Sequence, residues 1–423
     1  MDHPEFTAFV LVAGLLLAAA AQWRGWRPSL RTALAVGIGL RLTLLISAST
    51  DSWQPVDFNE GFRAAGQAIL HHQDPVLASQ GSWHFLPMIP YFYALALATG
   101  LPWEIAGRLC TIIADVVLIV LVGRLAGRKY AAAARFQYAC NPIALMVAVI
   151  HAQVEPISLV FLVAAYLLAR SARAGAENGG AGPNGAWAGA LFGFALSAKS
   201  WPIILLPVVL AMLPNWRQRL YGLVAAGAVP VFFLATLPLV VSSSWADMLN
   251  VARYLGEVRP IVGEWGWTAL MTHGNWTLAP MAAKVGQLIL YSTIALVIWM
   301  WWRADRIDQT SAILLAFMVV TPRMGAQYLL WFVPFLCARP TRWSRPAMTL
   351  GAVWAGIGYI YLTQFDDTGW WENHSWWAMS SVAIIPLLVL AMPWARRRPE
   401  TADRLPTPDT ELLPVTNEVS PSH

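Results

Sequence analysis

Long apolar segments, each close to the length needed to cross a bilayer, follow one another along almost the whole chain. A spanning helix needs roughly 20 apolar residues, within a range of about 17–25. The pattern predicts apolar helices at 6–22, 32–49, 106–123, 131–150, 154–170, 184–198, 200–213, 218–241, 286–302, 309–322, 326–338, 347–364 and 376–394. The two segments that flank Lys199 are short, and interrupted helices of this kind are tolerated where they line a protein-enclosed cavity.

Basic residues gather in alternate loops, and acidic residues gather in the loops between them. The first set of loops holds Arg24, Arg27, Arg31, Arg124, Arg128, Lys129, Arg135, Arg170, Arg173, Arg217, Arg219, Arg303, Arg306, Arg339, Arg342, Arg345 and Arg396 to Arg398. The second set holds Asp51, Asp57, Glu60, Asp74, Glu155, Glu257, Glu264, Asp366, Asp367 and Glu372. The positive-inside rule assigns the first set to the cytoplasm. We therefore expect a multi-pass membrane protein whose functional acids face the extracytoplasmic side. Only three of the 28 basic residues are lysine, which indicates GC-rich codon usage and favours a bacterial plasma membrane.

One apolar stretch, 84–101, does not fit this alternation, because a full crossing there would turn every later arginine loop outward. We expect it to form a re-entrant or interfacial element on the outer face. The outer loops at about 50–83 and 242–285 are long. In the first, Phe58, Phe62, Ala65, Ile69 and Leu70 recur at helical spacing and predict an amphipathic helix over 58–71.

Composition supports an all-α polytopic membrane protein. Of the 423 residues, 57% are hydrophobic and only 12% are charged, whereas soluble domains carry about a quarter charged residues. The net charge of +5 comes from arginines spread over many turns, which argues against nucleic-acid binding. We expect one membrane domain at 1–398 and a polar, Pro-rich cytoplasmic tail at 399–423 that is disordered.

Asp57 is the most informative acid, because it begins the predicted amphipathic helix just outside the membrane. It could cap that helix, or it could act as a general base. Glu60 lies on the same face and could complete a capping box or contribute to a metal site.

Two other places carry polar groups between apolar helices. The turn from His151 through Gln153 to Glu155 is either a solvated turn or a site that orients an acceptor hydroxyl. Lys199 lies between apolar helices, where an ionisable group indicates function. It belongs to a set of basic residues that defy the inside bias: Arg63, Arg108, Lys199, Arg253, Arg259, Lys284 and Arg323. Each of these could bind a phosphate, pair with a loop acid, or extend to the membrane surface.

Two further pairs of residues stand out. Arg41 and Asp115 lie within predicted spans, and we expect them to pair. Trp265 and Trp267 could stack on sugar rings, although packing is the commoner role of a tryptophan.

Several motifs occur in an order that resembles the GT-C superfamily of polyprenyl-phosphate-sugar glycosyltransferases. They are "VDFNEGFRAAGQAILHHQDPV", "HFLPMIPYF", "CNPIALMVAVIHAQVEPISLVFLVAAYLL", "ALSAKSWPIILLP" and "AQYLLWFVPFL". Within this superfamily the chain resembles the catalytic mannosyltransferase of GPI-anchor synthesis and actinobacterial mannosyltransferases, over about residues 55–338. The resemblance implies a GT-C-like bundle of about 11–14 transmembrane helices with amphipathic or re-entrant helices on the outer face.

The resemblance also assigns roles to residues. It places the catalytic acid at Asp57, and its other matching positions fall on Gln153, Glu155, Lys199, Gln327 and Tyr328. We expect Gln153, Glu155, Gln327 and Tyr328, together with Glu60 and His151, to orient donor and acceptor. We expect Lys199, together with Arg253 and Arg323, to bind phosphate. The mannosyltransferase has Asp-x-Asp in its outer loop, whereas Pro55 occupies the first of these positions here. A divalent metal is therefore possible but not favoured, and Asp51 or Glu60 are the acids that could substitute.

These observations predict an inverting glycosyltransferase that moves a hexose, with mannose expected, from a polyprenyl-phosphate donor to a lipid or glycan acceptor outside the cytoplasm. Nucleotide sugars stay in the cytoplasm, so an outward-facing transferase needs a lipid-linked donor. The alternatives are a lipid or solute transporter, against which the lack of a detectable internal repeat argues, and a catalytically degenerate scaffold.

Overall fold

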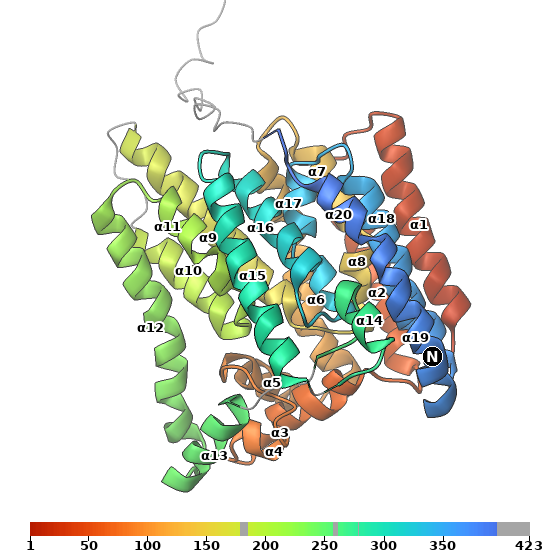
Figure 1. Cartoon of the computed structure of the whole chain (residues 1–423), viewed down its shortest axis with the longest axis vertical. Helices are drawn as coiled ribbons and strands as arrows, with labels where there is room; N and C mark the ends of the chain where they lie inside the picture. The colour runs from red at the N-terminus through yellow and green to blue at the C-terminus, as the bar shows by residue number, and fades with distance from the viewer. Residues whose placement is uncertain (178–184, 257–260, 278, 396–423) are drawn as a thin grey trace, which may run out of the picture.

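The computed structural model describes residues 1–177, 185–256, 261–277 and 279–395, and this part of the chain is a bundle of helices (Figure 1). Within it no strand forms, and Ile261 and Thr277 make an isolated bridge. The expected tail at 399–423 lies outside the described residues.

Seven segments of the described chain are long and apolar enough to cross a membrane. They are α1 (Pro4–Trp23), α2 (Leu30–Thr50), α6 (Trp103–Ala126), α9 (Glu155–Glu177), α12 (Trp216–Val240), α15 (Pro280–Met300) and Thr368–Ala391, which joins α19 (Asp367–Ser380) to α20 (Ile385–Ala391). An eighth is a bent pair, α7 (Ala131–Ala139) followed by Pro142–Ile150, with a 48° bend at the break. The protein is thus an all-α polytopic membrane protein, as the sequence predicts.

The remaining apolar helices are shorter. They are α5 (Met88–Ala98), α10 (Gly185–Ala198), η3 with α11 (Trp201–Met212), α16 (Arg306–Val320), η4 with α17 (Ala326–Ala338) and α18 with η5 (Ser344–Tyr361). Helix α5 is too short to cross a bilayer and packs against α3 (Ala64–Leu70) and α6. This agrees with a non-spanning element at 84–101.

Short helices gather at one end of the bundle, which we call the outer end. Figure 1 places α3, α4 (Pro75–Ala78), α5 and α13 (Trp245–Gly256) at its lower edge. The arginine distribution predicts that this end faces away from the cytoplasm.

The predicted amphipathic helix over 58–71 is present as a π-helical segment, η1 (Asp57–Arg63), that continues into α3. Phe58, Phe62, Ala65 and Ile69 are buried as expected. The prediction is wrong for Leu70, the last residue of α3, because its side chain is 44% exposed. The Phe58 ring stacks on Trp103 at 4.7 Å, and the Arg108 guanidinium lies 4.5 Å from the centre of the Phe58 ring. These contacts hold η1 against the first turns of α6.

Arg108 is a structural residue. It donates to the carbonyls of Val149 (2.8 Å) and Glu104 (2.9 Å) and to Gln54 Oε1 (2.8 Å). Its guanidinium thereby joins the segment before η1, α6 and η2 (Met146–Ile150).

Arg41 and Asp115 pair inside the bundle, as predicted. Arg41 Nε donates to Asp115 Oδ2 at 2.7 Å, and both side chains are fully buried between α2 and α6. Arg41 also donates to the carbonyls of Gly37 and Ala139, and Tyr138 donates to the second Asp115 oxygen. A buried ion pair needs such extra partners to offset its desolvation.

Helix α12 lies at the opposite edge of the molecule from α1 (Figure 1), and most of its surface is exposed. It packs chiefly on α10, where a Cβ added to Gly189 would lie 2.0 Å from the Gly222 carbonyl oxygen. Small residues at this contact allow the two backbones to approach closely.

Candidate functional site

Asp57 is the first residue of η1 and its side chain is exposed at the outer end. Its Oδ2 accepts a hydrogen bond from Gln153 Nε2 at 2.7 Å. The helix-cap alternative for Asp57 is wrong, because the N-cap position is Val56 and no side chain caps this helix. The carboxylate is thus free of a capping role and is directed toward the turn at 151–155.

That turn is not a solvated one. Gln153 and Glu155 are buried, at 1% and 0% exposure, and His151 is half-buried. The Gln153 N–H donates to the Val147 carbonyl at 3.0 Å, and Ala152 adopts a left-handed φ of 53°. This tight path turns the Gln153 side chain toward Asp57.

His151 extends the network from Asp57 into the protein. Gln153 Nε2 lies 3.1 Å from His151 Nε2, and His151 Nδ1 lies 2.7 Å from the Tyr359 hydroxyl. Since the Gln153 amide donates on both sides, His151 Nε2 must accept, and the ring proton lies on Nδ1 facing Tyr359. Loss of solvation lowers the pKa of His151 to about 4; the Asp57 charge opposes this shift, and Lys199 and Arg108 add to it. The histidine is therefore neutral near pH 7 and acts as an orienting group.

Glu155 and Lys199 form a buried ion pair next to this network. Lys199 lies in the break between α10 and η3, and Glu155 is the first residue of α9. The Lys199 ammonium lies 5.5 Å from the ring centres of both Phe85 and Tyr328, within the range of cation–π attraction. Among the described residues, Glu155 Oε2 has no hydrogen-bond partner. A buried carboxylate oxygen of this kind can accept a hydrogen bond from a hydroxyl group of a bound ligand.

Electrostatic reach links the two groups. The Asp57 charge acts on both Lys199 and His151. Contacts through Gln153 and His151 join Asp57 to the Tyr359 hydroxyl. The Glu155–Lys199 pair lies beside the Tyr328 ring. The outer end thus carries an exposed carboxylate, a buried ion pair and two phenols.

The positions of the other residues predicted for the site do not assign a role to them. Glu60 is exposed on η1 and forms no capping box. The Gln327 amide lies against Gly325, where an added Cβ would be 2.4 Å from Gln327 Oε1. Arg253 is exposed on α13, and Arg323 is half-buried between α16 and η4. The roles expected for these residues stay predictions.

Metal ligands do not converge in the described chain, where no three His, Cys, Asp or Glu side chains are grouped to hold an ion. Asp51 does not substitute for the missing acid at position 55. It is buried and accepts from the backbone N–H groups of Asp2 and Trp53.

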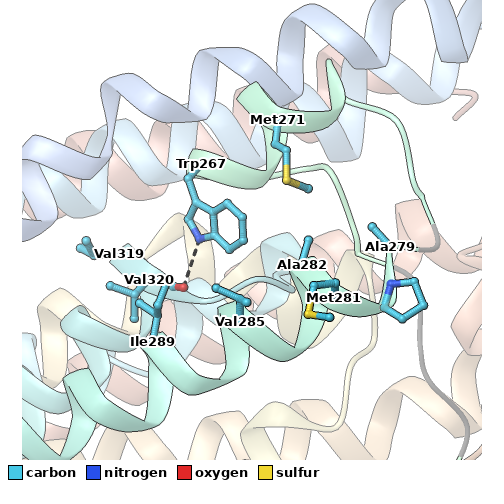
Figure 2. A pocket seen from close by; sticks show the side chains of 10 residues that line it. Trp267, Met271, Ala279, Met281, Ala282, Val285, Ile289, Val319 and Val320 are labelled. Carbon is cyan, nitrogen blue, oxygen red and sulfur yellow. Dashed lines mark hydrogen bonds between the residues drawn. The ribbon is translucent and has the colours of Figure 1, made fainter.

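Two cavities adjoin the outer end. One, of about 410 Å³, shares Phe85 and Ser200 with the surroundings of Lys199 and is otherwise lined mainly by apolar residues, including Leu196, Leu234 and Val251. The other, of about 700 Å³, is lined by Trp267, Met281 and Val285 and by residues near the end of α16 (Figure 2).

The two tryptophans considered for sugar stacking differ. Trp265 is buried and donates to the Met318 carbonyl at 2.6 Å, so it serves packing. Trp267 donates to the Val320 carbonyl at 3.1 Å and lines the larger, apolar cavity (Figure 2). Its surroundings suit a hydrocarbon better than a sugar.

Tyr359 and Glu264 are residues that the sequence did not single out for this site. Tyr359 lies in an apolar helix, where the sequence pattern indicates only that an aromatic residue packs against its neighbours. Glu264 appeared only as one of many outer acids. Phe85 was part of a quoted motif without an assigned role.

Comparison with known proteins identifies a family for most of these elements. The model of glycosyltransferase family 87 matches residues 88–324, which is more than half of the chain. The match includes His151, Gln153, Glu155 and Lys199 but not Asp57. No curated protein and no solved structure matches the chain.

Proposed function

Because the chain belongs to glycosyltransferase family 87, we propose that it transfers a hexose with inversion from a polyprenyl-phosphate donor to a lipid or glycan acceptor at the outer end of the bundle. Membership makes the protein a membrane glycosyltransferase. Mannose is the sugar that the resemblance favours. The donor, the sugar and the residue roles are our proposal.

One observation carries the assignment of the base: the exposed Asp57 carboxylate is anchored by Gln153, two residues before the Glu155 that pairs with the buried Lys199. A general base must reach the proton that it removes. Gln153 leaves Asp57 Oδ1 available to an acceptor hydroxyl. Neutral His151 keeps the Gln153 amide oriented as a donor.

The reaction follows from these positions. The acceptor oxygen attacks the anomeric carbon while its proton moves to Asp57. The bond between that carbon and the phosphate oxygen breaks, and polyprenyl phosphate leaves with the electron pair. Lys199 is the cation placed to stabilise the developing charge on the phosphate, with Phe85 and Tyr328 as its walls.

A lipid-linked donor agrees with the surroundings of Lys199. The cavity of about 410 Å³ that contains Phe85 and Ser200 also borders Leu234 and Leu237 of the exposed helix α12. A phosphate near Lys199 would therefore have an apolar space beside it for the first isoprene units.

Asp57→Asn tests the proposal directly. The asparagine keeps the shape but cannot take a proton, so transfer from labelled polyprenyl-phosphate mannose in membranes should fall about 10²–10⁴-fold. Membrane insertion should be unchanged. Glu5→Gln, which removes another exposed acid of the outer end, is the matched control and should keep full activity. Retained transfer in Asp57→Asn would remove Asp57 as the base.

A further inference from the structure

The loop at 261–277 is tightly closed. Backbone hydrogen bonds of 2.8 and 3.1 Å join Ile261 and Thr277. A Cβ at Gly263 would lie 2.1 Å from Thr272 Oγ1, so only glycine fits there without a shift. Ser375 on α19 donates to the His273 carbonyl at 2.7 Å. The residue after Gly263, Glu264, is thus held in a defined place against α19.

His374 of α19 faces this glutamate from a fully buried position. Its ring stacks on Trp370 at 4.3 Å and lies 5.2 Å from Trp377. His374 Nε2 is 3.7 Å from Glu264 Oε1, which is too long for a hydrogen bond. In the part of the chain that the structure describes, neither ring nitrogen has a hydrogen-bond partner. Buried polar groups are rarely left in this state, so packing alone does not account for this histidine.

Glu264 approaches the candidate site from a different element than Asp57 does. Asp57 comes from η1 and Glu155 from α9, whereas Glu264 comes from the loop before α14 (Gly266–Thr272). Trp377, 5.2 Å from His374, packs against Gly358, where an added Cβ would lie 2.6 Å from the Trp377 ring. Gly358 precedes Tyr359, whose hydroxyl contacts His151. The surroundings of Glu264 are therefore joined to the Asp57 network by side-chain contacts.

We propose that Glu264, held beside His374 by the closed loop, binds hydroxyl groups of a hexose in this site. This inference rests on the proposed sugar transfer and adds a binding role that the transfer step itself does not require. A carboxylate accepts from two neighbouring hydroxyls. Glu264 is the contacting residue, and the buried His374, whose Nε2 lies 3.7 Å from the carboxylate, is a positioning residue. The hexose is either the donor sugar or a sugar of the acceptor.

The kinetic test uses Glu264→Gln and His374→Phe in the full chain. The first keeps shape without charge, and the second keeps aromatic packing without nitrogens. We expect the KM of one substrate to rise about tenfold or more, while kcat changes less, because a site built to bind hydroxyls discriminates strongly. A higher donor KM assigns the donor sugar, and a higher acceptor KM assigns the acceptor. Unchanged KM values for both substrates in Glu264→Gln would overturn the inference.

The control is Glu372→Gln, an exposed acid on the same helix as His374, which should leave both KM values unaltered. His374→Asn restores a side-chain donor and acceptor and should recover part of the KM lost in His374→Phe. No recovery, with equal loss of thermal stability in both variants, would give His374 a packing role only.

A binding measurement separates this inference from the proposed reaction. Octyl mannoside is titrated onto the purified protein in phosphatidylcholine nanodiscs, without donor. Weaker binding by Glu264→Gln than by Asp57→Asn supports the hydroxyl-binding role even if no transfer is ever detected. Equal binding by Glu264→Gln and the unaltered chain contradicts it even if Asp57→Asn abolishes transfer.

Discussion

At the scale of single residues, the charges of Asp57 and Lys199 lie in opposite environments. Asp57 remains exposed and needs only one hydrogen bond from Gln153. Lys199 is buried and depends on Glu155 for neutralisation. Removing one member of a buried pair leaves an uncompensated charge, which costs about 3–5 kcal/mol. Any test of Lys199 must therefore separate its ligand role from its structural one.

The double variant Lys199→Met with Glu155→Gln makes this separation, because it replaces the ion pair with two neutral side chains. We expect near-normal thermal stability but an apparent KM for the polyprenyl-phosphate donor about tenfold higher, equivalent to roughly 1.4 kcal/mol. Lys199→Ala alone should lower both stability and donor affinity. Donor affinity equal to that of the unaltered chain in both variants would argue against phosphate binding by Lys199.

Sequence reasoning found Gln153, Glu155 and Lys199 because they lie between apolar helices. It found Asp57 because this acid begins an amphipathic helix in an outer loop. It could not find Tyr359, since a tyrosine within an apolar helix has the same pattern as a packing residue. It also could not decide whether Glu155 or a phosphate neutralises Lys199, because that depends on the distance between α9 and the end of α10.

At the scale of elements, the lengths of the apolar segments predicted the helices but not the breaks within them. The expected segment at 131–150 is one bent pair, with Asn141 capping the second half through hydrogen bonds to the Ile143 and Ala144 amides. The π-helical form of η1 was not predicted. Such local irregularity depends on tertiary contacts, such as those of Phe58 and Arg108, that a one-dimensional pattern does not contain.

The α10–α12 contact gives a prediction at this scale. In Gly189→Ala, the new Cβ would meet the Gly222 carbonyl oxygen, so the helices must separate, at a cost typical of overpacking, about 1–3 kcal/mol. Gly227→Ala on the same helix pair meets nothing within 4 Å and should be neutral or slightly stabilising. Thermal unfolding of both variants in one detergent measures the difference, and equal midpoints would mean that the close contact is absent in the membrane.

At the scale of the whole molecule, the arginine pattern assigns a side of the membrane to each end of the bundle, and the structure places the site residues at the end that carries α3, α4 and α13 (Figure 1). Hydropathy could predict the spans but not their lateral order. The neighbours of each helix depend on side-chain complementarity, such as the reciprocal hydrogen bonds between Trp354 of α18 and Trp377 of α19.

Cysteine labelling tests the orientation. Gln67 on α3 and Arg128 in the turn after α6 are both exposed. A membrane-impermeant maleimide added to intact cells should label Gln67→Cys and should label Arg128→Cys only after permeabilisation. The native cysteines are a small background, because Cys140 and Cys337 are buried and Cys110 is half-buried. The reverse labelling pattern would place the site in the cytoplasm.

The ion pair between Arg41 and Asp115 has a consequence for how the chain is made. A single charge at the centre of a membrane helix costs about 2.5–3.5 kcal/mol at insertion. The ribosome delivers α2 with its arginine well before α6 brings the aspartate, since the whole outer segment lies between them. Until then the translocon, water or lipid headgroups must solvate the Arg41 side chain. We therefore expect α2 to insert fully into the bilayer only together with α6.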